Sequence, residues 1–173
     1  MFADLSPLIA AGAHWLTRAY PASGGALADA LCEAQARQAA TVAARLRYPT
    51  ATDAALVGLA GPGGSGRLDW VSGADADGFL DDHAWRTWVD EVVVSWAACL
   101  LGDPELAAAA VAALAEDDPG PGTPPAFRRL VAPDDRDLGA AALLRHPDLL
   151  APVAGLHRAR LLDRLGPGRA LAA

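Results

Sequence analysis

The chain has 173 residues, 53% of them hydrophobic, and a formal net charge of −7. A chain of this length is expected to form one domain. All 14 basic residues are arginines, and the absence of lysine excludes Schiff-base chemistry and a standard phosphate-binding P-loop. The negative charge argues against binding of nucleic acid or acidic membranes by the whole surface.

Helix is the dominant expectation, because 42 alanines and 25 leucines favour it while valine and isoleucine together number only eleven. Proline, glycine and capping residues divide the chain into segments. The sequence predicts helices over residues 7–20, 26–48, 52–60, 80–101, 104–117, 135–146 and 147–165, the last with a break near Ala151. We therefore expect an all-α fold, one compact domain of six to eight helices that form an irregular bundle.

Residues 61–78 interrupt the helical pattern with six glycines, so this stretch is expected to be the main loop. Leu68–Val71 within it is compatible with a short strand or with burial in the core. Val92–Val94 also suits a strand, although the pattern around it favours helix. Gly61–Leu68 has the spacing of a Walker A loop but carries Arg67 and Leu68 where that motif needs Lys and Ser or Thr.

A Pro/Gly connector at 119–125 separates an acidic body, 1–118, from C-terminal helices, 126–173. Residues 1–127 hold 6 arginines against 16 acidic residues, whereas residues 128–173 hold 8 arginines against 5. The simplest consequence is that the C-terminal helices dock on the acidic body within one domain. A nucleic-acid-associated regulator that uses the basic C-terminal helices is an open but less favoured alternative.

Asp81, Asp82 and His83, with Glu91 further along, form the densest group of metal-ligating residue types. His83 and Glu91 are eight residues apart, about 12 Å along a helix, so one ion cannot readily be held by both. The acids instead suit the N-terminal end of the helix predicted over 80–101. No metal, cofactor or catalytic residue is assigned, and a small metal-dependent enzyme built on this cluster stays an alternative.

Five tryptophans against three phenylalanines are unusual, and three of them, Trp85, Trp88 and Trp96, fall in the predicted 80–101 helix. Indole rings can fill the space between alanine-rich helices, or line a groove that receives a peptide or a partner helix. Arg158 and Arg160 on the last helix are further candidates for contact with a partner. These five residues are the predicted partner-binding set.

Cys32 and Cys99 lie in apolar patterns without metal-binding spacing, and residues 1–5 carry an acid where a secretory signal needs basic residues. A cytoplasmic protein is therefore expected, and the composition resembles that of a GC-rich bacterial source. Because no complete catalytic constellation is present, we predict a non-enzymatic accessory or adaptor protein. It would bind a partner protein or peptide, one version being the partner subunit of a peptide-modifying biosynthetic enzyme.

Overall fold

A computed structural model describes residues 4–73, 84–117 and 127–166, and within these ranges every regular element is helical. The all-α class and the single compact arrangement are confirmed, and the described residues form ten α-helices where six to eight were expected. In chain order they are α1 (Ser6–Ala19), α2 (Ala26–Arg47), α3 (Ala51–Ala60), α4 (Ser65–Ser72), the 3-10 helix η1 (Ala84–Trp88), α5 (Glu91–Gly102), α6 (Pro104–Asp117), α7 (Arg128–Val131), α8 (Asp135–Ala140), α9 (Pro147–Gly155) and α10 (Arg158–Leu165).

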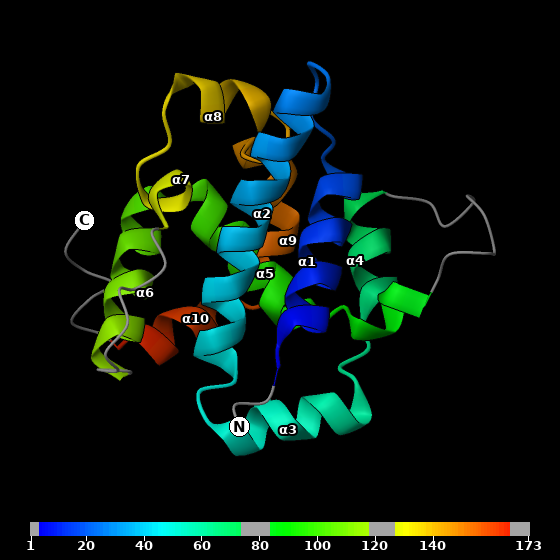
Figure 1. Cartoon of the computed structure of the whole chain (residues 1–173), viewed down its shortest axis with the longest axis vertical. Coiled ribbons are helices and arrows are strands. Elements are labelled where there is room, and N and C mark those ends of the chain that lie inside the picture. Colours follow the sequence, from blue (N-terminus) through cyan, green and yellow to red (C-terminus); the bar gives the residue numbers. More distant parts are fainter. Residues whose placement is uncertain (1–3, 74–83, 118–126, 167–173) are drawn as a thin grey trace.

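Helices α2 and α5 form the centre of the molecule. α1 packs on α2, α2 packs on α5, and α9 covers another side of α5 (Figure 1). α3 lies across one end of the bundle and α8 lies at the opposite end, beside the first turns of α2 (Figure 1). The core is therefore built around two long, largely buried surfaces, one on α2 and one on α5.

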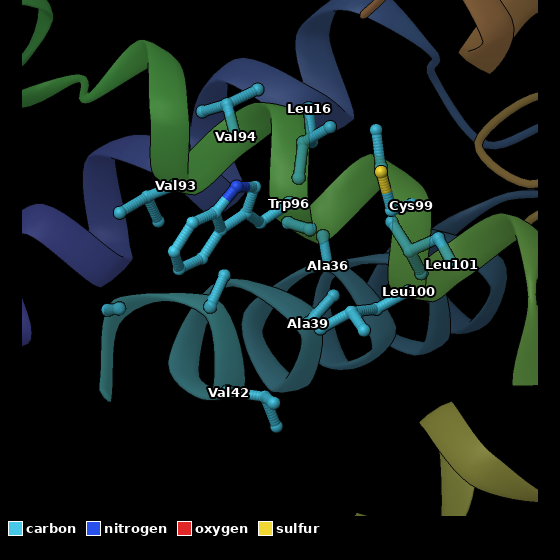
Figure 2. Close-up of a cluster of buried hydrophobic side chains, with 14 of the residues drawn as sticks. Leu16, Ala36, Ala39, Val42, Val93, Val94, Trp96, Cys99, Leu100 and Leu101 are labelled. Atoms are coloured by element: carbon cyan, nitrogen blue, oxygen red, sulfur yellow. The ribbon is translucent and has the colours of Figure 1, made fainter. Parts of the chain in front are cut away.

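Small side chains let these central helices approach each other closely. Five alanines of α2, at positions 36, 39, 40, 43 and 44, are completely buried. From α5, the indole of Trp96 lies toward α2 beside Val93, with Ala36 nearby (Figure 2). One large ring thus fills the space that several alanines leave, as close packing of the interior requires.

α5 begins eleven residues later than the predicted helix over 80–101. Asp90 caps α5 by accepting hydrogen bonds from the backbone N–H groups of Val92 and Val93, at 2.8 and 3.2 Å. Its carboxylate also accepts a bond from the hydroxyl of Tyr48 and one from Arg47 Nε at 3.1 Å. The prediction of one long helix was wrong because Asp90, held by the end of α2, starts the helix. Asp81 and Asp82, the caps that the sequence suggested, lie outside the described residues.

The stretch 61–78 also differs from the expected loop, because α4 occupies its middle. Leu68 of α4 is completely buried, whereas Trp70 is 84% exposed. Glycines flank the helix: Gly64 precedes it with φ +133° and Gly73 ends it in the left-handed conformation. The strand alternatives for Leu68–Val71 and for Val92–Val94 are both wrong, since both segments are helical.

The C-terminal helices are shorter than predicted. α8 ends at Ala140, and the break in the last helical segment lies between Gly155 and Arg158 instead of near Ala151. Side chains of α5 bind the backbone at this break: Ser95 Oγ bonds to the oxygen of Ala154 at 3.1 Å and accepts the N–H of His157 at 3.0 Å. The helix is therefore interrupted where α5 supplies replacement hydrogen bonds, and Pro152 is accommodated within α9.

Arg145 is the centre of a buried polar network that joins the C-terminal segments to α2 and α5. Its guanidinium donates to Gln35 Oε1 at 2.5 Å and to the backbone oxygens of Leu101 and Arg129, both at 2.8 Å. Gln35 Nε2 in turn donates to the backbone oxygen of Asp137 at 2.8 Å. A single side chain thus satisfies acceptors from three separate segments.

Arginines of the C-terminal part are largely used inside the molecule. Arg129 pairs with the fully buried carboxylate of Asp137, and Arg128 lies 3.4 Å from its other oxygen. Arg164 Nε donates to the backbone oxygen of Leu46 at 3.2 Å. These contacts give the arginines of the C-terminal part a structural role within the fold, and this role does not require a nucleic acid.

We expect Arg145→Met to lower the free energy of unfolding by about 3 kcal/mol, because it removes a charged donor and leaves buried acceptors unpaired. Arg136→Met is the control, since Arg136 is exposed on α8 and its replacement should change stability by less than about 0.5 kcal/mol. Urea unfolding followed by circular dichroism measures both. Equal stabilities of the two variants would contradict the assigned role of Arg145.

Alkaline pH should destabilise the fold through its two tyrosines. Burial raises the pKa of Tyr48 to about 12, helped by the hydrogen bond to Asp90, and burial also raises the pKa of Tyr20. A raised pKa means that the folded state favours the neutral phenol over the tyrosinate. The contribution of the two phenols to the free energy of unfolding is therefore complete below about pH 10 and is lost as pH rises above it. Absorbance titration should show little tyrosinate at pH 10 in the folded protein and about half ionisation in urea. Half ionisation in the folded protein would contradict this.

Candidate functional site: an indole-lined groove

The short helix η1 places two indoles on one side of the chain. Trp85 and Trp88 are three residues apart, and a 3-10 helix has three residues per turn, so their side chains lie nearly above one another. η1 packs on α1. Both indoles are partly exposed, in contrast to the buried ring of Trp96.

These two indoles line a groove of about 510 Å³ formed with α1 and α2. α1 contributes residues at three- and four-residue steps, which is one face of a helix. α2 adds a charged pair one turn apart. The lining residues are Pro7, Ala10, Ala11, His14, Thr17, Glu33, Arg37, Trp85 and Trp88.

Trp85 is held in place by aromatic and cationic neighbours. The ring of His14 meets its indole edge-on, with 4.5 Å between the centroids. The guanidinium carbons of Arg18 and Arg86 lie 5.9 and 5.6 Å from the indole centroid, within the range of a cation–π contact. The position of this wall of the groove is therefore fixed from both α1 and η1.

Asp69 of α4 stabilises the position of η1 beside α1 through two hydrogen bonds. It accepts a hydrogen bond from Arg86 and another from Trp15 Nε1, the latter at 3.0 Å. Trp15 is buried in the core face of α1. One carboxylate thus ties η1 to α1 through α4, and it neutralises the charge of Arg86.

Trp85 has an unsatisfied polar atom. Its Nε1 is buried and has no hydrogen-bond partner, the one such side-chain atom among the described residues. A buried donor without an acceptor costs about 1–3 kcal/mol.

The polar edge of the groove is adjustable. Glu33 Oε1 and Arg37 Nη2 form an ion pair at 2.8 Å across one turn of α2, with about half of each side chain exposed. An exposed pair of this kind contributes little stability, about 0–1 kcal/mol. Both side chains can therefore exchange this contact for one with a ligand at small cost.

The structure brings together two of the five predicted partner-binding residues. Trp96 is 4% exposed and its Nε1 donates to the backbone oxygen of His157 at 3.1 Å, so it serves the core. Arg158 and Arg160 lie on α10, which contributes nothing to the groove. Arg158 faces Asp103 at 4.0 Å, and Arg160 is exposed.

Sequence reasoning missed the other walls of the groove. His14, Thr17 and Arg37 belong to no recognised sequence motif. Their regular spacing on α1 and α2 is the one signal in the sequence. This spacing alone could not predict a groove, because the position of η1 against α1 depends on contacts between residues that are distant in sequence.

A second polar site joins Glu91 to His157. Glu91 Oε1 lies 2.6 Å from His157 Nε2 and 3.7 Å from Arg67 Nη1, and the first two side chains are about four-fifths buried. The hydroxyl of Ser95 bonds to backbone atoms of this region instead of to the imidazole. The arrangement links α4, α5 and the α9–α10 break, which is a structural role.

The expected alternative of a metal site gains no support from the described residues. Within 4–73, 84–117 and 127–166, no group of three or more His, Cys, Asp or Glu side chains is placed to hold an ion. Asp81, Asp82 and His83 lie outside these ranges. Glu91, the fourth member of that predicted cluster, is paired with His157.

The two cysteines are poor nucleophiles in this fold. Both are free and buried. Burial raises the pKa of Cys32 to about 11 and also raises the pKa of Cys99. Because the thiolate is the reactive form, neither side chain suits covalent catalysis near neutral pH.

No protein-family model, curated protein or solved structure matches the chain. The side chains of this molecule are therefore the guide to its function. In the part of the chain that the structure describes, no helix combines the length and the apolar character needed to cross a bilayer.

We expect Trp96→Ala to lower the free energy of unfolding by about 3–5 kcal/mol, because it empties a core position. Trp88→Ala should cost about 1 kcal/mol, because its partly exposed ring faces the groove. Chemical denaturation gives both values, and Trp96→Phe gives an intermediate value if the alanine variant does not fold. A larger loss for Trp88→Ala would place that indole in the core.

Proposed function

We propose that this protein is a non-enzymatic accessory protein that binds a peptide, or a peptide-like segment of a partner protein, in the groove between α1, α2 and η1. The observation that carries the proposal is the pair of partly exposed indoles, Trp85 and Trp88, beside a floor of small residues. Tryptophan in such a position is a preferred anchor for binding energy.

The dimensions of the groove suit a short peptide. Pro7 and Thr17 are ten residues apart on α1, so the groove is about 15 Å long at 1.5 Å per residue. An extended peptide covers this length with four or five residues at about 3.3 Å each. The volume of about 510 Å³ also lies within the range of ligand sites in proteins.

The finer version of the proposal is that the partner is a peptide-modifying biosynthetic enzyme or its peptide substrate. A groove for a short peptide supports this version, because such a helper subunit must hold an otherwise unstructured segment. The identity of the neighbouring genes would test it independently, since an accessory protein is usually encoded close to the enzyme that it serves.

Photo-crosslinking tests the location of the binding surface. The full chain carries p-benzoylphenylalanine at Thr17, on the groove, or at Asp163, exposed on α10, and is irradiated in extract from its native host. We expect a defined partner to be crosslinked from Thr17 and lost on Trp88→Ala, because the anchor is removed. Trp70→Ala is the matched control, since Trp70 is exposed on α4 and does not line the groove.

Two outcomes would contradict the proposal. Crosslinking from Thr17 that is unchanged by Trp88→Ala means that the indole is not an anchor. Crosslinking from Asp163, together with loss of the partner on charge reversal at Arg158 and Arg160, transfers the binding surface to α10.

A further inference from the structure

The outward face of α3 is apolar and has no partner among the described helices. Ala54 and Val57 of this helix are buried against the body, whereas Leu56 and Leu59 are 60% and 85% exposed. No described helix packs extensively on α3, which lies across one end of the bundle with its outer side directed away from the other helices (Figure 1). A helix that is apolar on all sides is normally buried, so a further surface is expected to cover this face.

The exposed side chains have the spacing of a helix face that packs on another helix. They follow one another at three- and four-residue steps, which places them in one stripe along α3. This α3 stripe consists of Thr52, Ala55, Leu56 and Leu59. Two large side chains and two small ones thus share one face.

The α3 stripe carries no charge. No ionisable residue occurs between Asp53 and Arg67 in the sequence, and the Asp53 carboxylate accepts the backbone N–H and the hydroxyl of Thr50, at 3.2 and 2.6 Å, in the capping box. Two copies with a net charge of −7 each repel one another on average, but at the α3 stripe they meet without opposing charges. A lipid surface fits less well, because helices that bind there carry basic residues on the polar face and α3 has none.

We propose that the α3 stripe is the interface of a weak homodimer, in which the α3 helices of two copies pack antiparallel around a two-fold axis. Such an interface uses the same residues from both copies, so the face must complement itself. With the axis between Ala55 and Leu56, each leucine of the stripe faces a small residue of the other copy: Leu56 faces Ala55, and Leu59 faces Thr52. The antiparallel arrangement also brings opposite ends of the two helix dipoles together.

This inference is independent of the proposed function, because no residue of α3 lines the groove. Analytical ultracentrifugation of the full chain tests it. We expect the mean mass to rise from 17.7 kDa toward twice that value between about 10 µM and 1 mM, since a single short helix makes a small interface.

Two matched substitutions test the surface. Leu59→Glu places an unpaired charge in the apolar contact and should weaken the association at least about tenfold. Leu27→Glu makes the same change in the first turn of α2, at the opposite end of the bundle from α3 (Figure 1), where Leu27 is 71% exposed. This control should leave the association unchanged, and circular dichroism checks that both variants fold.

Disulfide trapping locates the contact. Ala55 lies beside the two-fold axis, so Ala55→Cys brings two thiols close enough to form a disulfide. The natural Cys32 and Cys99 are buried and do not interfere. Under mild oxidation we expect Ala55→Cys to form covalent dimers at least about tenfold faster than Ala30→Cys, which replaces an exposed alanine of α2.

Four results would overturn the inference. A chain that stays monomeric up to about 1 mM has no such dimer. Association that survives Leu59→Glu, or that Leu27→Glu abolishes, places the contact on another surface. If Leu59→Glu lowers the free energy of unfolding of the dilute monomer, the chain covers α3 itself. Binding of the monomer to phosphatidylcholine vesicles that Leu59→Glu abolishes assigns the face to lipid.

The dimer and the proposed function can fail separately. Trp88→Ala, which is expected to release the partner from the groove, should leave the concentration dependence of the mass unchanged. Leu59→Glu should remove the dimer and keep the crosslinking from Thr17. Loss of the dimer on Trp88→Ala would place self-association in the groove and would also overturn the inference.

Discussion

The carboxylate of Asp90 determines where the central helix begins, and the position of the groove depends on it. Asp90 caps α5 with one oxygen and binds Tyr48 and Arg47, at the end of α2, with the other. The chain before it is thereby separated from α5 and forms η1 against α1. Without this cap a continuous helix would carry Trp85 and Trp88 along the axis of α5, away from the face of α1 that they now line.

The tryptophan side chains differ in burial because some lie between packed helices and others do not. Buried alanines on α2 leave room that Trp96 fills from α5 (Figure 2). Trp15 is buried on the core side of α1. At η1 no second layer of helix covers the rings among the described residues, so Trp85 and Trp88 stay partly exposed. The same residue type thus packs the interior where helices face each other and lines an open groove where they do not.

Local signals predicted much of the helical framework, while contacts distant in sequence decided the site. Proline and glycine correctly marked both ends of α2, and Asp103 caps α6 as its sequence suggests, with a 2.9 Å bond from the N–H of Leu106. The start of α5 was not predictable because Asp81, Asp82 and Asp90 are equally good caps, and only the partners of Asp90 on α2 distinguish it. Consequently two groove indoles were anticipated, but they were assigned to the same helix as the buried Trp96.

α1 makes the groove a preformed surface. Its core side carries Leu8, Trp15 and Leu16, and the hydroxyl of Tyr20 just after it donates to the backbone oxygen of Leu149 at 3.0 Å. The groove side of this anchored helix therefore does not need to be ordered when a ligand binds. Since ordering of side chains and loops subtracts from affinity, a peptide of four or five residues can obtain useful binding energy from a few anchors only on such a rigid surface. The rigid framework and the small alanine side chains on α1 therefore make the groove a surface on which a short peptide would lose little affinity to ordering of the protein.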